Sequence, residues 1–311
     1  MSTHELSFSF KQVDNPLEAD GMIATGDHKL AAQLLNHGWS GFFPWGTMYA
    51  WGCLPTHESV SLMADNKGRD PQKKPFFLSS TNHYIDNLLK KSELIENTPA
   101  PVVDVVKKFY QLGEKTGHPA ALLLPATEHD NLPEGLTGHT VIPDHNGLPQ
   151  TFKTTGMMVA GSAALHYRQI LSHLDDHVIT VTSANFSGLG GGSGHHRAGG
   201  LVKDFNHLKK VFIFIGDPHQ EGQGISTSVA CITYNQANFI TAYLTRDGSL
   251  SIQEMTNMLL LSGISRVVID SNIKRVPPYD YSSYLPTELG EIFDQLINNI
   301  SVHQTLQISV R

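Results

Sequence analysis

The sequence predicts an α/β (α+β) protein built on a twisted, mixed, open β-sheet. Two observations lead to this fold class. Short apolar runs rich in Val, Ile, Phe and Thr, which are typical of buried strands, recur along the chain. Between some of them lie longer segments in which apolar residues follow the period of a helix. Because strands and helices do not alternate strictly, the pattern indicates a mixed sheet.

The elements follow from these two patterns. The expected strands are the apolar runs at 41–43, 121–124, 178–182, 211–215, 228–233, 239–244 and 267–269. The expected helices are the helix-period segments at 27–36, 82–95, 102–115, 163–174, 252–261 and 287–300. Asp27 and Pro101 stand at helix starts, and Gly38 and Gly263 lie just past helix ends.

Three stretches break the pattern. Residues 125–156 are dense in Pro, Gly, Asp and His, which predicts an irregular excursion. Residues 187–200 are glycine-rich, which predicts a mobile loop or a ligand flap. The organisation expected is a main domain over residues 1–250 and a helical C-terminal extension over residues 251–311.

Composition excludes several classes of protein. The 311 residues are 40% hydrophobic and 16% charged, which is typical of a chain with a packed core rather than a disordered one. No run approaches eighteen apolar residues, and the first residues do not form a signal peptide, so no membrane span is expected. Two cysteines, Cys53 and Cys231, cannot form a disulfide framework and fit a cytoplasmic location. A net charge of −7 argues against binding nucleic acid by charge alone.

Several familiar motifs are absent. Gly188 and Gly190 are followed by Ser193 where a dinucleotide motif needs its third glycine. The chain has no P-loop, H-E-x-x-H or C-x-x-C, so no metal ligands are expected from local sequence. His195 and His196, in the glycine-rich loop, are interpreted as solvated loop residues.

Three clusters carry chemistry. Lys67 and Arg69, separated by a glycine, can converge on one polyanion, although a solvated basic turn is the alternative. Ser183 and Asn185 stand where an apolar strand runs into the glycine loop, as at a ligand rim or in a polar turn. Ser226 and Arg246 flank the next two strands as capping or surface groups, or as ligand contacts.

Together these clusters resemble, in order and spacing, the YrdC-like family of threonylcarbamoyl-AMP synthases over about residues 20–250. The corresponding segments are PWGTMYAWG at 44–52, KGR at 67–69, SANFSG at 183–188, STSV at 226–229 and RDG at 246–248. The resemblance implies a twisted sheet with a concave face that binds ATP beside an amino acid. It also implies condensation of threonine, bicarbonate and ATP into threonylcarbamoyl-adenylate and pyrophosphate, which supplies a tRNA modification.

The resemblance also implies roles for individual residues. Lys67 and Arg69 would be the catalytic cations. ATP would be bound by Lys67, Arg69, Asn185, Ser193 and Arg246, with Mg²⁺ on its phosphate oxygens. The amino-acid substrate would lie against Thr47, Ser183 and Ser226. The implied partners are these small molecules and proteins of the tRNA-modification pathway, with no membrane.

The sequence departs from the family at several positions. Trp45 replaces the first threonine of its motif and is expected to reshape the pocket mouth. Met158 and Ser162 stand where the family has an arginine and a histidine, and His166 and Arg168 are nearby substitutes. A divergent enzyme with adenylate or carbamoyl chemistry on another substrate is therefore one alternative. An RNA-binding module without enzymatic activity is the other.

Overall fold

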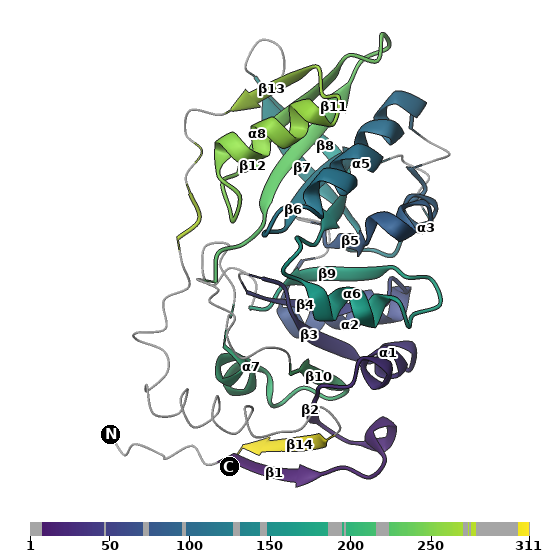
Figure 1. The fold of residues 1–311 in the computed structure, drawn as a ribbon, viewed down its shortest axis with the longest axis vertical. Coiled ribbons are helices and arrows are strands. Elements are labelled where there is room, and N and C mark those ends of the chain that lie inside the picture. The colour runs from purple at the N-terminus through teal and green to yellow at the C-terminus, as the bar shows by residue number, and fades with distance from the viewer. Residues whose placement is uncertain are drawn as a thin grey trace.

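The computed structural model describes residues 8–46, 48–70, 75–94, 98–126, 131–143, 148–185, 195, 197–215, 224–269, 273, 275–277 and 304–310. Within these residues the chain forms one mixed, fourteen-stranded sheet with helices packed against it (Figure 1). This confirms the predicted fold class. No helix in this part of the chain is both long and apolar enough to cross a membrane.

The strands run in the order β1-β14-β2-β10-β3-β4-β9-β5-β8-β6-β11-β12-β13, with β7 paired to β8. In chain order the first seven are β1 (Phe8–Gln12), β2 (Met22–Thr25), β3 (Ser40–Pro44), β4 (Tyr49–Cys53), β5 (Phe77–Ser80), β6 (Ala120–Pro125) and β7 (Thr137–Pro143). The others are β8 (Pro149–Val159), β9 (Ile179–Ser183), β10 (Val211–Phe214), β11 (Ser228–Tyr234), β12 (Ile240–Arg246), β13 (Arg266–Ile269) and β14 (Thr305–Val310).

The helices are α1 (His28–Asn36), α2 (His57–Lys67), α3 (Ile85–Lys91), α5 (Ala100–Gly113), α6 (Leu165–Leu171), α7 (Ala198–Phe205) and α8 (Ile252–Leu261). Two short 3₁₀ turns, η1 (Pro16–Glu18) and η2 (Asn82–Tyr84), complete the described helical residues. As expected, Asp27 caps α1, accepting hydrogen bonds from two backbone N–H groups. Gly38 and Gly263 follow helix ends with φ of 79° and 102°, a conformation that favours glycine.

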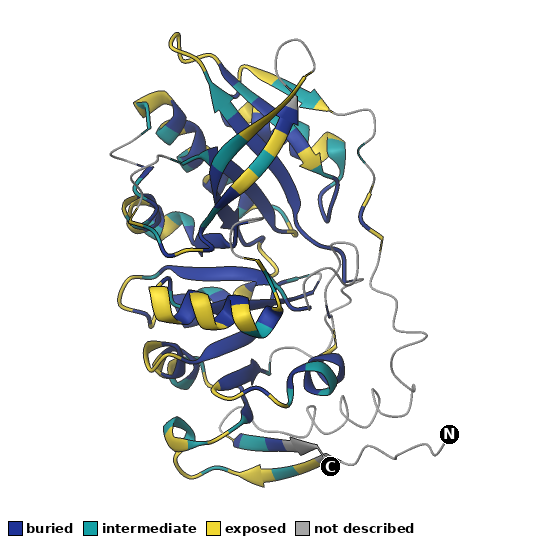
Figure 2. Ribbon diagram, turned by 180° about the vertical axis from the view of Figure 1, so that it is seen from behind, coloured by how far each residue is buried: buried dark blue, intermediate teal, exposed yellow. Residues whose placement is uncertain are grey.

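The core lies on both faces of the sheet because side chains alternate along each strand. On β10, for example, Val211 and Ile213 join one apolar cluster, and Phe212 and Phe214 join the other. Helices α2, α3, α5, α7 and α8 bury their apolar sides in the first cluster, and α1 and α6 bury theirs in the second. The strands in the middle of the sheet are accordingly buried along most of their length (Figure 2).

The prediction for residues 125–156 is wrong. The structure forms a hairpin there, in which β7 pairs antiparallel with β8 from Thr137 opposite Thr155 to Pro143 opposite Pro149. The first three residues of β8 are exposed, and the strand becomes buried only in its second half. A polar strand that projects from the sheet lacks the continuous apolar run that predicts a buried strand.

The glycine-rich stretch and the C-terminal stretch also differ from expectation. Ala198, Gly199 and Gly200, predicted as loop, are buried and begin α7. The segment 251–311, expected to be a helical extension, contains α8 and the strand expected at 267–269, which is β13 and pairs with β12, but also β14, which was not expected and lies between β1 and β2. The helix expected at 287–300 lies outside the described residues.

Candidate functional site

The end of helix α2 places Lys67 inside the protein. Gly68 ends the helix in a left-handed conformation (φ 62°), so the chain turns back and the next residue is Arg69. The Lys67 side chain is 1% exposed. Its ammonium group donates to the carbonyl oxygens of Ser183, at 2.5 Å, and Asn185, and to Oδ1 of Asn185 at 3.1 Å. A buried ammonium is costly without acceptors for its protons, and these three oxygens supply them.

The tip of strand β9 forms the other side of this contact. Ser183 is the last residue of the strand, and its hydroxyl donates to Oδ1 of Asn185 at 2.7 Å. That oxygen therefore accepts hydrogen bonds from both Ser183 and Lys67. The arrangement fixes the orientation of the Asn185 amide, because only its oxygen end suits two donors.

Two arginines stand close together beyond Lys67. The Arg69 guanidinium lies 4.5 Å from the centre of the Phe76 ring. Burial, with the neighbouring charge of Arg246, lowers the pKa of Arg69 to about 10. Burial also lowers the pKa of Arg246, whose guanidinium donates to the Ser226 hydroxyl at 3.0 Å. Both remain cationic at neutral pH. Two partly buried like charges suit an anionic ligand.

The structure thus joins the predicted residues that it describes into one group. Hydrogen bonds link Ser183 and Asn185 to Lys67, and another links Arg246 to Ser226. Arg69 follows Lys67 by two residues, and the charge of Arg246 contributes to lowering its pKa. We call these six residues the cation group. Thr47 and Ser193, the other two predicted site residues, lie outside the described residues.

The chemistry of the cation group is that of a binding site for anions. Its members are three cations, two hydroxyls and one amide. In the described part of the chain, no three His, Cys, Asp or Glu side chains gather in a way that would hold a metal ion. Asp247, next to Arg246, is 9% exposed, and its Oδ1 makes no hydrogen bond. The group therefore provides positive charge and neutral hydrogen-bonding groups that can position an anion.

Trp45 does not have the position expected of it. It is fully buried and packs edge-on against the Tyr167 ring, with ring centres 4.3 Å apart, so it belongs to the core and not to a pocket mouth. Met158 is also buried, in strand β8, where its carbonyl oxygen accepts hydrogen bonds from the Ser79 and Tyr110 hydroxyls. The side chains of Trp45 and Met158 therefore belong to the core.

The two proposed substitutes for the lost cation have other partners. Nδ1 of His166 lies 3.0 Å from Nε2 of His28 on helix α1. Arg168 donates to the carbonyl oxygens of Glu114 and Gly161, each at 3.3 Å. These contacts hold neighbouring segments together.

His195 is a residue whose environment the sequence did not indicate. It was expected to be solvated, but its side chain is fully buried and its Nε2 lies 2.8 Å from Oδ2 of Asp204 on helix α7. Its ring meets the Phe205 ring edge-on. The nine-residue separation of His195 and Asp204 matches no motif, so only the folded chain reveals the pair. His196 lies outside the described residues.

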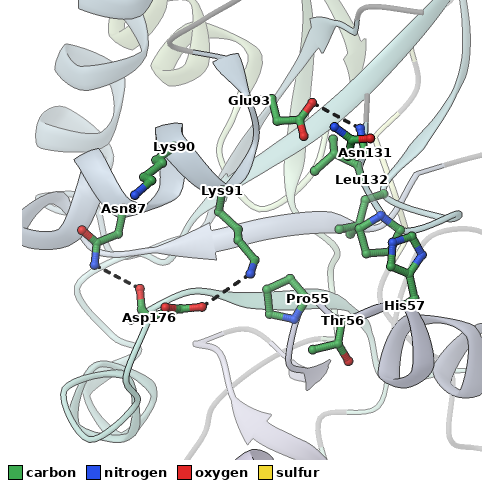
Figure 3. Close-up of a pocket in the computed structure, with 12 residues that line it drawn as sticks. Pro55, Thr56, His57, Asn87, Lys90, Lys91, Glu93, Asn131, Leu132 and Asp176 are labelled. Carbon is green, nitrogen blue, oxygen red and sulfur yellow. Dashed lines mark hydrogen bonds and ion pairs between the residues drawn. The ribbon is translucent and has the colours of Figure 1, made fainter. Parts of the chain in front are cut away.

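A separate cavity of about 680 Å³ lies between the start of α2 and the end of α3 (Figure 3). No member of the cation group is among its lining residues. Its charged side chains contact other groups of its wall: Lys91 lies 3.4 Å from the Asp176 carboxylate, and Glu93 accepts from the Asn131 N–H at 3.3 Å. The size suits a small molecule, but the balanced charges distinguish it from the cation group.

Comparisons with known proteins support the fold. No family model matches the chain, and no curated protein matches it in sequence. Among solved structures it is similar to Sua5 of P. abyssi complexed with L-threonine, with a TM-score of 0.52, 19% identity and coverage of 86% of this chain and 69% of that one.

Two further structures are similar. A doubly substituted variant of the same Sua5 gives a TM-score of 0.52 and 19% identity over 84% of this chain and 67% of that one. YciO of E. coli gives a TM-score of 0.44 and 13% identity over 75% and 97%. Sua5 is a threonylcarbamoyl-AMP synthase of the YrdC family. The chain therefore has the fold of Sua5, as the sequence resemblance implies.

Proposed function

We propose that this chain uses ATP to form a carbamoyl-adenylate from an amino acid and bicarbonate, with threonine as the amino acid. The observation that carries the proposal is the pair of partly buried arginines, Arg69 and Arg246, together with a strand tip held by Lys67. The Sua5 structure that resembles this chain is a complex with L-threonine, which supports the choice of substrate.

The reaction suits the groups present. The amino nitrogen of the amino acid bonds to the carbon of bicarbonate, and a C–O bond breaks with release of water, which gives a carbamate. A carbamate oxygen then attacks the α-phosphorus of ATP. The new phosphorus–oxygen bond replaces the bond to the bridging oxygen, which leaves with pyrophosphate. The protein's task is to hold two anions together and to balance the charge of the leaving group. Arg69 and Arg246 would neutralise the phosphates, and Ser183, Asn185 and Ser226 would orient the substrates.

Mg²⁺ would come with the nucleotide. The cation group contains no carboxylate, and Asp247 is the acidic side chain next to Arg246. A hard cation prefers oxygen ligands, which the phosphates supply. We therefore propose that ATP carries the metal, and that the metal adds positive charge at the phosphate oxygens.

The test is pyrophosphate release with ATP, bicarbonate, Mg²⁺ and a panel of amino acids. We expect release that depends on bicarbonate and on threonine. Arg246→Ala should lower kcat/KM for ATP about 10- to 100-fold, because a charge-assisted contact is lost. Arg266→Ala, at an exposed position on β13, is the matched control and should leave turnover unchanged. ATP binding without turnover of any amino acid would contradict the proposal.

A second candidate is the same chemistry on another amine. It is favoured by Ser162, an exposed residue where the family has a histidine, since Trp45 and Met158 lie in the core. Release with a non-threonine amine, and none with threonine, would select it. Proteins of tRNA modification are proposed partners only if threonine is the substrate.

A further inference from the structure

The tip of strand β9, which carries Ser183 and Asn185, is hydrogen-bonded to the backbone of His195 in the stretch 187–200. Ala184, between Ser183 and Asn185, donates its N–H to the carbonyl oxygen of Tyr49 at 3.1 Å. Tyr49 donates to the carbonyl oxygen of His195 at 2.7 Å, and His195 donates to that of Ala184 at 3.1 Å. The backbones of Ala184, Tyr49 and His195 thus form a closed ring of three hydrogen bonds at the strand tip.

The side chain of His195 fixes this ring to helix α7. Its Nε2 lies 2.8 Å from Oδ2 of Asp204, whose side chain is 12% exposed. The next residue, Phe205, packs on Trp51 with ring centres 5.1 Å apart. The Trp51 ring in turn lies 5.9 Å from Nζ of Lys67. The same aromatic group therefore supports both His195 and Lys67.

The chemical nature of this anchor calls for an explanation. Burying an imidazole and a carboxylate costs solvation free energy, and an apolar pair of similar size often gives equal stability. A short hydrogen bond does, however, fix direction, which apolar packing does not. The pair is thus better suited to orientation than to stabilisation.

We infer that Asp204 and His195 are positioning residues, which hold Ser183 and Asn185 in the geometry that binds the nucleotide. The inference rests on the proposed function for its kinetic consequences. Neither residue is assigned to the reacting atoms. Their effect passes through the Ala184–Tyr49–His195 ring to the strand tip and to Lys67, which donates to Ser183 and Asn185.

The experiment compares apolar with conservative variants of the full chain. His195→Leu and Asp204→Leu should each raise KM for ATP about tenfold, the effect of one lost charge-assisted hydrogen bond. Each also takes this hydrogen bond from a largely buried partner and should lower the melting temperature, which the double variant should restore, so KM is measured well below each melting temperature. His195→Gln and Asp204→Asn retain a donor and an acceptor and should stay within about threefold of wild type. The double variant His195→Leu/Asp204→Leu should be no worse than either single one.

Lys107→Met is the matched control, because it breaks an exposed ion pair of similar length, 2.7 Å to Asp86. It should change neither kcat nor KM. Wild-type KM in His195→Leu would overturn the inference, as would a loss of activity that only follows a loss of stability.

A second measurement separates this inference from the proposed function. Amide hydrogen exchange at Ala184 and Tyr49 should be faster in His195→Leu than in wild type, whatever the protein binds. If wild type binds no ATP, the proposed function fails. Unchanged exchange in the variant would then still overturn the positioning role, and faster exchange would support it.

Discussion

The cation group and the cavity of Figure 3 lie at opposite ends of helix α2 and hold their charges differently. In the cavity, Lys91 is half-exposed and lies against the Asp176 carboxylate. In the cation group, Lys67 donates to carbonyl and amide oxygens, and Arg246 donates to a hydroxyl. Neutral acceptors satisfy these hydrogen bonds without cancelling charge, whereas a carboxylate partner cancels it. The cavity of Figure 3 is thus the weaker candidate for an anion site.

The largest expected effect comes from Arg69→Met. Its pKa is lowered because folding disfavours the charged form, so at neutral pH the charge costs stability. Methionine keeps the apolar contact with Phe76 and removes the repulsion from Arg246. We expect pyrophosphate release to fall by at least about tenfold, while the free energy of unfolding stays equal or rises. Kinetics and urea denaturation on one preparation measure both.

The reverse result would break the comparison. If Arg69→Met unfolds more easily and keeps wild-type kcat/KM for ATP, the charge of Arg69 serves the fold rather than a ligand.

Lys67→Met tests the buried end of helix α2. The substitution removes a charged donor from three oxygens of Ser183 and Asn185, of which the Ser183 carbonyl keeps the Asn185 N–H and Asn185 Oδ1 keeps the Ser183 hydroxyl. The free energy of unfolding should therefore fall by about 1–3 kcal/mol. Lys90→Met, the same change at an exposed position in the cavity wall, should change it by less than about 0.5 kcal/mol. Urea denaturation measures both, and equal losses would refute the contrast.

Much of the fold could be predicted because burial leaves continuous apolar runs. Strand β10, Val211–Phe214, is buried throughout and is found from its sequence alone. Strand β14 was not predicted, because its place between β1 and β2 depends on partners almost three hundred residues away. Helix α2 was missed because its buried side mixes Ser59 and Lys67 with apolar residues, which weakens the helical pattern.

The site could be predicted only in part, for a related reason. Sequence motifs identify Lys67, Arg69, Ser183 and Asn185 as residue types, and the structure shows them in contact or close along the chain. Two of the three Lys67 acceptors are backbone carbonyls, which have no sequence signature. The contact of Asp204 with His195 likewise requires the packing of α7 against the strand tip.

The pair of His28 and His166 tests whether burial and a like charge disfavour the charged form of a side chain that can release its proton. Burial lowers the pKa of His28, and the neighbouring His166 lowers it further. Since the folded pKa lies below the unfolded value, stability is fully present above about pH 6.5 and falls as the pH decreases through the folded pKa. His28→Asn should flatten this acid-side loss, and His57→Asn, at an exposed position, should not. Free energies of unfolding of the wild type and both variants, measured at pH 5.5 and pH 7.5, test this prediction.

The smallest expected effect concerns the cavity pair Lys91 and Asp176. Both side chains are substantially exposed, at 38% and 66%, and their 3.4 Å contact is long for an ion pair. A double-mutant cycle with Lys91→Met and Asp176→Asn should give a coupling below about 1 kcal/mol that vanishes at high salt. Neither variant should change pyrophosphate release. A tenfold loss of pyrophosphate release in Lys91→Met alone would place the anion site in this cavity. Loss of an exposed ion pair does not by itself slow a reaction at a distant site, so the ligand would have to bind beside Lys91.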